Sequence, residues 1–340
     1  MEEREREQRE RRENGLKTSL SAENHPSYTP TLSPQEKPYT PPTEGVAVRM
    51  AESGENEIFT LRDGEFDIAH KETLGAGTSG TAYKVMWRER GEYYCVKLVR
   101  GAGSVCSEEQ EREIRTLMKL NNMFIIEFFG TFRHEGEFYI VTELCTHGTL
   151  KSLIDEHKSE HTSIPNGELW KYLIQMMLGL REFHTHSIVH FDIKPANIFL
   201  GEANTIKIGD VGSAKEFSEM HTHTSQASTT FQYSAPEFFG DEHTRLLSFP
   251  FDMWSVGCVL YELCFLRPPF NVRSMLNLAR SITSTEPDYN EGEKEEFIPI
   301  IKRLLDKNPK TRMTMDEFFN DPVVRRRGRQ VGSQLSPRRH

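Results

Sequence analysis

Two short segments near the middle of the chain place acidic, basic and amide side chains at fixed spacing between apolar runs. The first, VHFDIKPANIFL at residues 189–200, carries Asp192, Lys194 and Asn197. The second, IGDVG, adds Asp210 after another apolar stretch. Carboxylate and amide oxygens suit magnesium, and a carboxylate beside a lysine can receive a proton while the lysine neutralises phosphate charge. The residue types and their spacing therefore predict phosphoryl-transfer chemistry.

The same two segments resemble the catalytic loop and the magnesium-binding turn of eukaryotic protein kinases. The resemblance implies that Asp192 accepts the proton of a substrate hydroxyl and that Lys194 neutralises the γ-phosphoryl group. It also implies that Asn197 and Asp210 hold magnesium. ATP and Mg²⁺ are therefore the expected cofactors, and protein substrates are the expected partners.

A glycine-rich stretch upstream is similar to the loop that covers the phosphates of ATP in this family. Glycine lets backbone N–H groups approach phosphate oxygens without an intervening side chain. A dinucleotide site would need a helix to open inside the motif, whereas strand-like sequence continues to Trp87. The resemblance implies ATP contacts from Leu74, Gly75, Ala76, Gly77, Thr78, Ser79, Gly80, Thr81 and Ala82.

A lysine within an apolar strand is the next candidate. Lys97 follows the glycine-rich stretch, and a buried ammonium requires an anionic partner. By the resemblance, Glu113 in the following helical stretch is that partner, and Lys97 holds the α- and β-phosphates. Residues 138–145 resemble the connection between the two kinase lobes, so the backbone groups of Glu143 and Cys145 are expected to bind the adenine edge.

The elements that must position these residues change type along the chain. Alternating, β-rich sequence predicts strands at 66–74, 81–88, 93–99, 128–132 and 138–144 around one helix at 107–120. Helical periodicity then predicts helices at 169–184, 251–265, 272–281 and 295–305. The expected fold class is α+β. The resemblance implies a two-lobed protein kinase fold over 65–324, with a small β-rich N-lobe at 65–144 and a larger helical C-lobe at 145–324.

Further matches continue to the end of this domain. Residues 230–237 are similar to the segment that ends in Ala-Pro-Glu, and Glu237 is expected to pair with Arg312. Asp252 stands at the expected start of the central helix that anchors the catalytic loop. Thr230 together with Lys194 resembles serine/threonine kinases, because this pair frames a short hydroxyl at the catalytic base.

Two departures from the family pattern bear on control. Phe191 replaces the arginine before the catalytic aspartate, so the loop is of the non-RD type, and activity is expected to survive loss of phosphate from the segment between Asp210 and Glu237. Val211 replaces the phenylalanine of the Asp-Phe-Gly turn. The chain most resembles the NIMA-related group, with a Wee-like catalytic loop. A dual-specificity or tyrosine-directed kinase therefore remains an alternative, and a pseudokinase or scaffold remains another.

The bulk properties limit the other classes of function. The net charge of −9 argues against a general nucleic-acid binder, which needs clustered cations to neutralise phosphates. The five cysteines form no C-x-x-C pair, which favours a reducing compartment. The longest apolar run, 253–266, is too short to span a bilayer. We expect a soluble, cytoplasmic protein, with the nucleus as an alternative location.

Both ends of the chain differ in composition from the middle. Residues 1–64 combine a mixed-charge run with Pro/Ser/Thr-rich sequence, and residues 325–340 form a basic run. Such sequence buries little apolar surface, so both segments are expected to be disordered tails. The Ser/Thr-Pro steps at Thr29, Ser33, Thr40 and Ser336 suit proline-directed phosphorylation, and both tails are candidate sites for regulatory partners. The basic run is also a candidate nuclear address.

Overall fold

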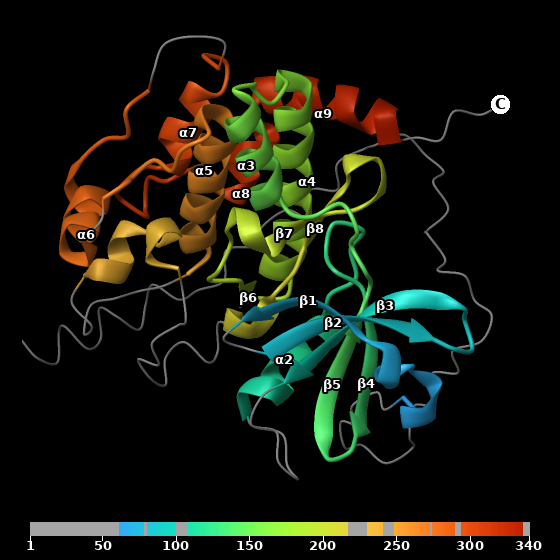
Figure 1. Cartoon of the computed structure of the whole chain (residues 1–340). Helices are drawn as coiled ribbons and strands as arrows, with labels where there is room; N and C mark the ends of the chain where they lie inside the picture. Colours follow the sequence, from blue (N-terminus) through green and yellow to red (C-terminus); the bar gives the residue numbers. More distant parts are fainter. Residues whose placement is uncertain are drawn as a thin grey trace, which may run out of the picture. The chain divides into compact units, whose positions relative to one another are not determined.

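The computed structural model describes residues 61–77, 80–99, 108–216, 230–240, 248–272, 274–289 and 294–335. The predicted contacts of Thr78 and Ser79, the Ser/Thr-Pro steps and most of the N-terminal tail lie outside these residues. A five-stranded antiparallel sheet is followed along the chain by a larger helical part (Figure 1). The predicted α+β class and two-part organisation are thus confirmed.

The sheet has the strand order β1-β2-β3-β5-β4. Its strands are β1 (Glu72–Gly77), β2 (Gly80–Trp87), β3 (Glu92–Val99), β4 (Phe128–His134) and β5 (Glu137–Thr142). The helix α2 (Glu108–Lys119) lies between β3 and β4 in the chain. Side chains alternate between the two faces of each strand, so each face builds its own apolar cluster.

The two faces of the sheet are covered by different parts of the chain. Val99 and Ile140 share a cluster with Ile114 of α2, which fixes α2 against one face. Val96 and Tyr139, which alternate with them along β3 and β5, join the cluster of the other face. That second cluster includes Phe66, Ile68 and the partly buried Leu61 from the segment before β1.

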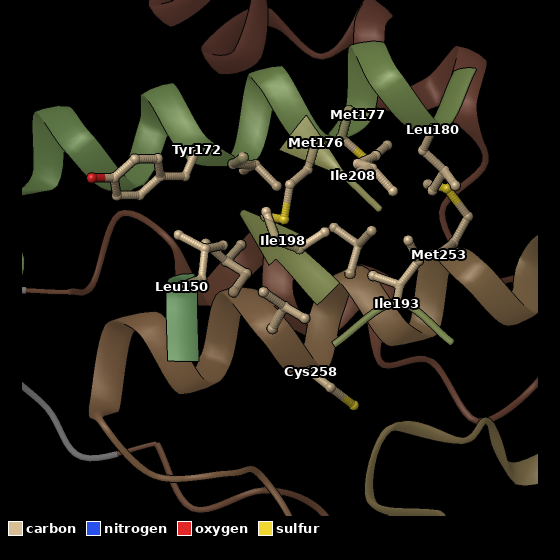
Figure 2. Close-up of a cluster of buried hydrophobic side chains, with 14 of the residues drawn as sticks. Leu150, Tyr172, Met176, Met177, Leu180, Ile193, Ile198, Ile208, Met253 and Cys258 are labelled. Carbon is tan, nitrogen blue, oxygen red and sulfur yellow. The ribbon is translucent and has the colours of Figure 1, made fainter. Parts of the chain in front are cut away.

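The helical part is built around α5 (Phe249–Phe265), which is almost wholly buried. The other helices are α3 (Leu150–Glu160), α4 (Asn166–Thr185), α6 (Met275–Ser284), α7 (Ile298–Leu304), α8 (Met315–Asn320) and α9 (Pro322–Leu335). Short strands lie between α4 and α5 in the chain: β6 (Ile188–Val189), β7 (Ile198–Leu200), β8 (Ile206–Ile208) and β9 (Lys215–Glu216). Figure 2 shows side chains of β7 and β8 packed between α4 and α5.

Several predicted boundaries are corrected by the structure. The first strand was expected at 66–74 but runs from Glu72 to Gly77, because residues 68–70 form a 3₁₀ turn. The folded part begins before residue 65, since the Leu61 N–H donates to the Thr131 carbonyl at 2.6 Å. Leu61 packs on the apolar cluster of the outer sheet face, which holds this segment in place.

The expected basic tail at 325–340 is wrong for residues 325–335, which continue α9. Val324 and Val331 are seven residues apart on this helix and are 3% and 5% exposed. Arg327, between them, donates to Glu296 at 2.5 Å. One apolar stripe and one ion pair therefore hold this arginine-rich sequence against the helical part.

Candidate active site

The segment 190–198 is anchored in the core on both sides of its polar residues. Ile193 and Ile198 are about 1% and 0% exposed, respectively, and Figure 2 shows both among side chains of α4 and α5. The Asp252 carboxylate at the start of α5 accepts the backbone N–H groups of His190 at 2.9 Å and Phe191 at 3.0 Å. Hydrogen bonds to a charged acceptor are stronger than neutral ones, so α5 fixes the backbone directly before Asp192. The predicted anchoring of this loop by the central helix is present.

His190 connects the same loop to the turn that carries Asp210. Its Nδ1 accepts the Asp192 N–H at 3.2 Å, and its Nε2 lies 3.2 Å from the Gly209 carbonyl. One tautomer, with the hydrogen on Nε2, satisfies both contacts. His190 therefore joins the residue before Asp210 to Asp192.

The carboxylate of Asp192 is only 7% exposed and is surrounded by donors. Lys194 Nζ donates to Oδ2 at 2.6 Å, and Asn197 Nδ2 donates to the same oxygen at 2.9 Å. Thr230 approaches the other oxygen, with both its N–H and its hydroxyl 3.3 Å from Oδ1. Lys194 also donates to the Thr230 hydroxyl at 2.9 Å. Three of the predicted residues and Thr230 thus form one network around a single carboxylate.

A second ionic group lies where the sheet meets α2. Lys97 Nζ is 2.6 Å from Glu113 Oε1 and 3.7 Å from Asp210 Oδ1. Burial alone would lower the pKa of Lys97, but the charges of Glu113 and Asp210 raise it above its ordinary value. The lysine therefore stays cationic, and the predicted Lys97–Glu113 pair is present.

The glycine-rich stretch is formed by the end of β1 and the start of β2. Gly77 pairs with Gly80, and Ala82 pairs with Lys97 on β3, so the stretch lies beside that lysine in the sheet. Gly80 has φ +151°, and a Cβ there would be 2.1 Å from the Leu98 carbonyl oxygen. Only glycine fits this close approach of β2 to β3.

The predicted adenine-binding residues directly follow β5. The Glu143 N–H already donates to the Glu127 carbonyl at 2.9 Å. The Glu143 carbonyl accepts the Thr142 hydroxyl at 3.5 Å and has a second lone pair for a ligand. Its side chain is 2.8 Å from Lys207 Nζ and accepts the Glu127 N–H at 2.7 Å. Sequence reasoning missed Lys207, because nothing in the local pattern links β8 to residue 143.

The segment that carries Thr230 is fastened to the helical part farther along. Glu237 pairs with Arg312 through both carboxylate oxygens, at 2.7 and 2.8 Å, as predicted. Tyr233, which lies between Thr230 and Glu237 in the chain, donates to Glu262 of α5 at 2.6 Å. Burial and the neighbouring Glu262 raise the pKa of Tyr233, so its hydroxyl remains a donor.

Asn197 and Asp210 have the chemistry that magnesium needs. Asn197 uses its amide nitrogen on Asp192, which leaves its side-chain oxygen for a cation. Asp210 supplies a carboxylate that is 38% exposed. Among the described residues, no group of three or more His, Cys, Asp or Glu side chains could hold a metal by itself. One carboxylate and one amide oxygen suit magnesium, which is commonly held by few protein oxygens together with substrate phosphates.

The described part of the chain has no helix with the length and apolar character needed to cross a membrane.

Comparison with known proteins agrees with this geometry. The protein kinase domain model matches residues 68–324. The chain is 29% identical to "Probable serine/threonine-protein kinase nek2" of Dictyostelium discoideum, over 72% of this chain and 60% of that protein. It is also 29% identical to human serine/threonine-protein kinase Nek2, over 76% of the chain and 63% of that protein. The G2-specific protein kinase fin1 of Schizosaccharomyces pombe is 28% identical, over 74% and 38% respectively.

The chain therefore spans less than two thirds of each of these relatives. Their names support the predicted likeness to the NIMA-related group. Because the domain model matches about three quarters of the sequence and the predicted catalytic side chains meet in one place, the chain belongs to the protein kinase family.

Proposed function

We propose that this protein transfers the γ-phosphoryl group of ATP to serine and threonine hydroxyls of protein substrates. The network of Asp192, Lys194 and Thr230 carries this proposal. It combines a fixed carboxylate, a cation and a hydroxyl-bearing wall within 3.3 Å of one another. A short serine or threonine side chain fits beside a base that Lys194 and Thr230 flank.

The chemical step follows from these positions. The acceptor hydroxyl, oriented by Asp192, bonds to the γ-phosphorus while the bond to the bridging oxygen of ADP breaks, and the hydroxyl proton passes to Asp192. Lys194 neutralises charge on the transferred group, and Lys97 holds the α- and β-phosphates. Asn197 and Asp210 would hold magnesium, which would supply further charge neutralisation. The glycine-rich stretch and the backbones of Glu143 and Cys145 bind the nucleotide.

Magnesium-dependent ATP turnover with a serine, threonine and tyrosine peptide array tests the proposal. Asp192→Asn keeps the size of the side chain but removes the base, so turnover should fall at least a hundredfold, about the effect of losing general base catalysis. Asp155→Asn on the exposed side of α3 is the matched control and should act like the wild type. A folded wild-type protein without turnover would instead favour a scaffold, and turnover on tyrosine peptides alone would favour the tyrosine-directed alternative.

We further propose a role in intracellular signalling or cell-cycle control, in the cytoplasm or the nucleus, with residues 1–60 and 336–340 as sites for regulatory partners. Support comes from the Nek relatives and from the name of the G2-specific relative. Kinase activity immunoprecipitated from synchronised cells should vary between cell-cycle stages. A constant activity would remove the cell-cycle part of the proposal, and imaging of the tagged full chain would decide its location.

A further inference from the structure

Phe191 directly precedes Asp192, and its ring enters the core. The residue is 2% exposed, and its ring centroid lies 5.2 Å from that of Phe251 at an interplanar angle of 63°. Its φ of +64° is an uncommon conformation for a bulky side chain. The surroundings must therefore hold this residue, and the Phe251 ring packs on it from α5.

Two more rings continue from Phe251 toward the segment that carries Thr230. The Phe238 centroid is 6.3 Å from Phe251, and the Phe231 centroid is 5.8 Å from Phe238. All three separations lie within the range of favourable aromatic pairs, about 4.5–7 Å. The rings of Phe191, Phe251, Phe238 and Phe231 therefore form a continuous series of contacts, called here the aromatic link.

The far end of the aromatic link returns to Asp192 by a polar route. Phe231 is bonded to Thr230, whose N–H and hydroxyl both lie 3.3 Å from Asp192 Oδ1. Hydrogen bonds of this length are long. Thr230 is the residue proposed to frame the substrate hydroxyl beside Asp192. The packing of residue 231 thus bears directly on where Thr230 stands relative to Asp192.

We propose that the aromatic link positions Asp192 and Thr230 relative to each other, so that its four phenylalanines are positioning residues for the reaction. This inference rests on the proposed function of Asp192 and Thr230. Contact between rings requires no charge, so the link holds the two segments together by apolar packing alone. If the rings only filled core volume, their loss would lower stability without altering the site.

The first test compares Phe191→Leu and Phe251→Leu with Phe297→Leu. Phe297 is the matched control because it is fully buried and its ring lies 4.9 Å from Trp170, outside the link. The link variants should lose about tenfold to a hundredfold in kcat, as expected for a small displacement of reacting groups. Their KM for ATP should be unchanged, because the ring contacts that form the link join these four phenylalanines and include neither Lys97 nor a described residue of the glycine-rich stretch. Phe297→Leu should lose melting temperature while keeping kcat.

The double variant Phe191→Leu/Phe251→Leu should lose no more kcat than the worse single variant, since both changes break the same link. Equal kcat in wild type and link variants, or multiplicative losses in the double variant, would overturn the proposal. Phe231→Leu tests the link even if the core variants misfold, because Phe231 is 37% exposed and its replacement disturbs the core least.

Amide hydrogen exchange tests the aromatic link without turnover. Exchange at the Thr230 N–H, which faces Asp192, should be faster in Phe231→Leu and Phe251→Leu than in the wild type or Phe297→Leu. The expected difference is at least about threefold, because loss of the link weakens local protection from exchange. Unchanged exchange at Thr230 would refute the link. A wild type without turnover would refute the proposed function instead, so the two failures are distinct.

Discussion

Single and double substitutions of Glu237 and Arg312 should show that these two largely buried charges are strongly coupled in their effect on stability. Arg312 is fully buried at its side chain and Glu237 is 11% exposed. The guanidinium also donates to the Pro250 carbonyl at 2.7 Å and the Asp306 carbonyl at 2.9 Å. Glu237→Gln keeps one acceptor but leaves the buried cation without a counter-charge. Breaking such a pair from one side costs about 3–5 kcal/mol of unfolding free energy.

Arg312→Met should cost at least as much, about 3–5 kcal/mol, because it leaves a buried carboxylate and two carbonyls without their donor. In the double variant Glu237→Gln/Arg312→Met no unpaired charge remains, so the loss should stay near that of the methionine variant. Independent effects would instead add to about 6–10 kcal/mol. The expected coupling between the two sites, the summed single losses minus the loss in the double variant, is therefore about 3–5 kcal/mol.

Urea denaturation of the four proteins measures this coupling directly. The matched control is the same cycle on Lys151 and Asp155, an i,i+4 pair on α3 with side chains 44% and 56% exposed. Exposed pairs of this kind couple by about 0.3–0.5 kcal/mol. An exposed pair contributes at most roughly 1 kcal/mol. If both single variants at 237 and 312 stay within about 1 kcal/mol of the wild type in unfolding free energy, or if their losses add, the reasoning from burial is wrong.

Three further outcomes follow from the charges and burial of other groups. Burial alone would raise the pKa of Glu296, but hydrogen bonds from Trp170 and Arg327 lower it below 4.5. A lowered folded-state pKa adds stability above the unfolded value that is lost as the pH falls through the folded value. Glu296→Gln should therefore cost stability at neutral pH and progressively less in acid, and a pH-independent difference in urea denaturation would contradict this. Burial, with the charge of Glu143, raises the pKa of Cys145 to about 12, so iodoacetamide at neutral pH should label Cys145 in unfolded but not in folded protein, as read by mass spectrometry. Phosphatase treatment should leave turnover intact, because residue 191 offers a buried ring in place of an arginine that a phosphate would neutralise, and abolished turnover with ATP still present would refute this.

The sequence was most informative where the chemistry lies within short spacings. Asp192, Lys194 and Asn197 come from one loop, so their order along the chain already limits how they can meet. Lys97 was predictable for another reason, since a lysine in an apolar strand must have an acid nearby. Strand β2 was expected at 81–88 and runs from Gly80 to Trp87, because alternating side chains fix a strand closely.

Contacts between distant segments carried little local signal. Residues 325–335 read as a tail because their arginines dominate the composition. Their helix depends on Val324 and Val331 meeting the core and on Glu296 lying opposite Arg327, and neither partner is near in sequence. The alternation of Phe66 and Ile68 likewise predicts a strand where the structure has a turn before β1. Their burial under the sheet, rather than within it, is a tertiary effect.

Phe191 shows how the two levels of description combine. The sequence reveals only that an arginine is missing, so the loop lacks the cation at position 191 that a phosphate would neutralise. The structure shows what the replacement contacts: a ring at 2% exposure, packed on Phe251, on a backbone held by Asp252. An arginine in this place would bring its charge into an apolar contact, which is costly without an anionic partner. The ring of Phe251 therefore suits an apolar side chain at position 191 and offers no counter-charge to an arginine there.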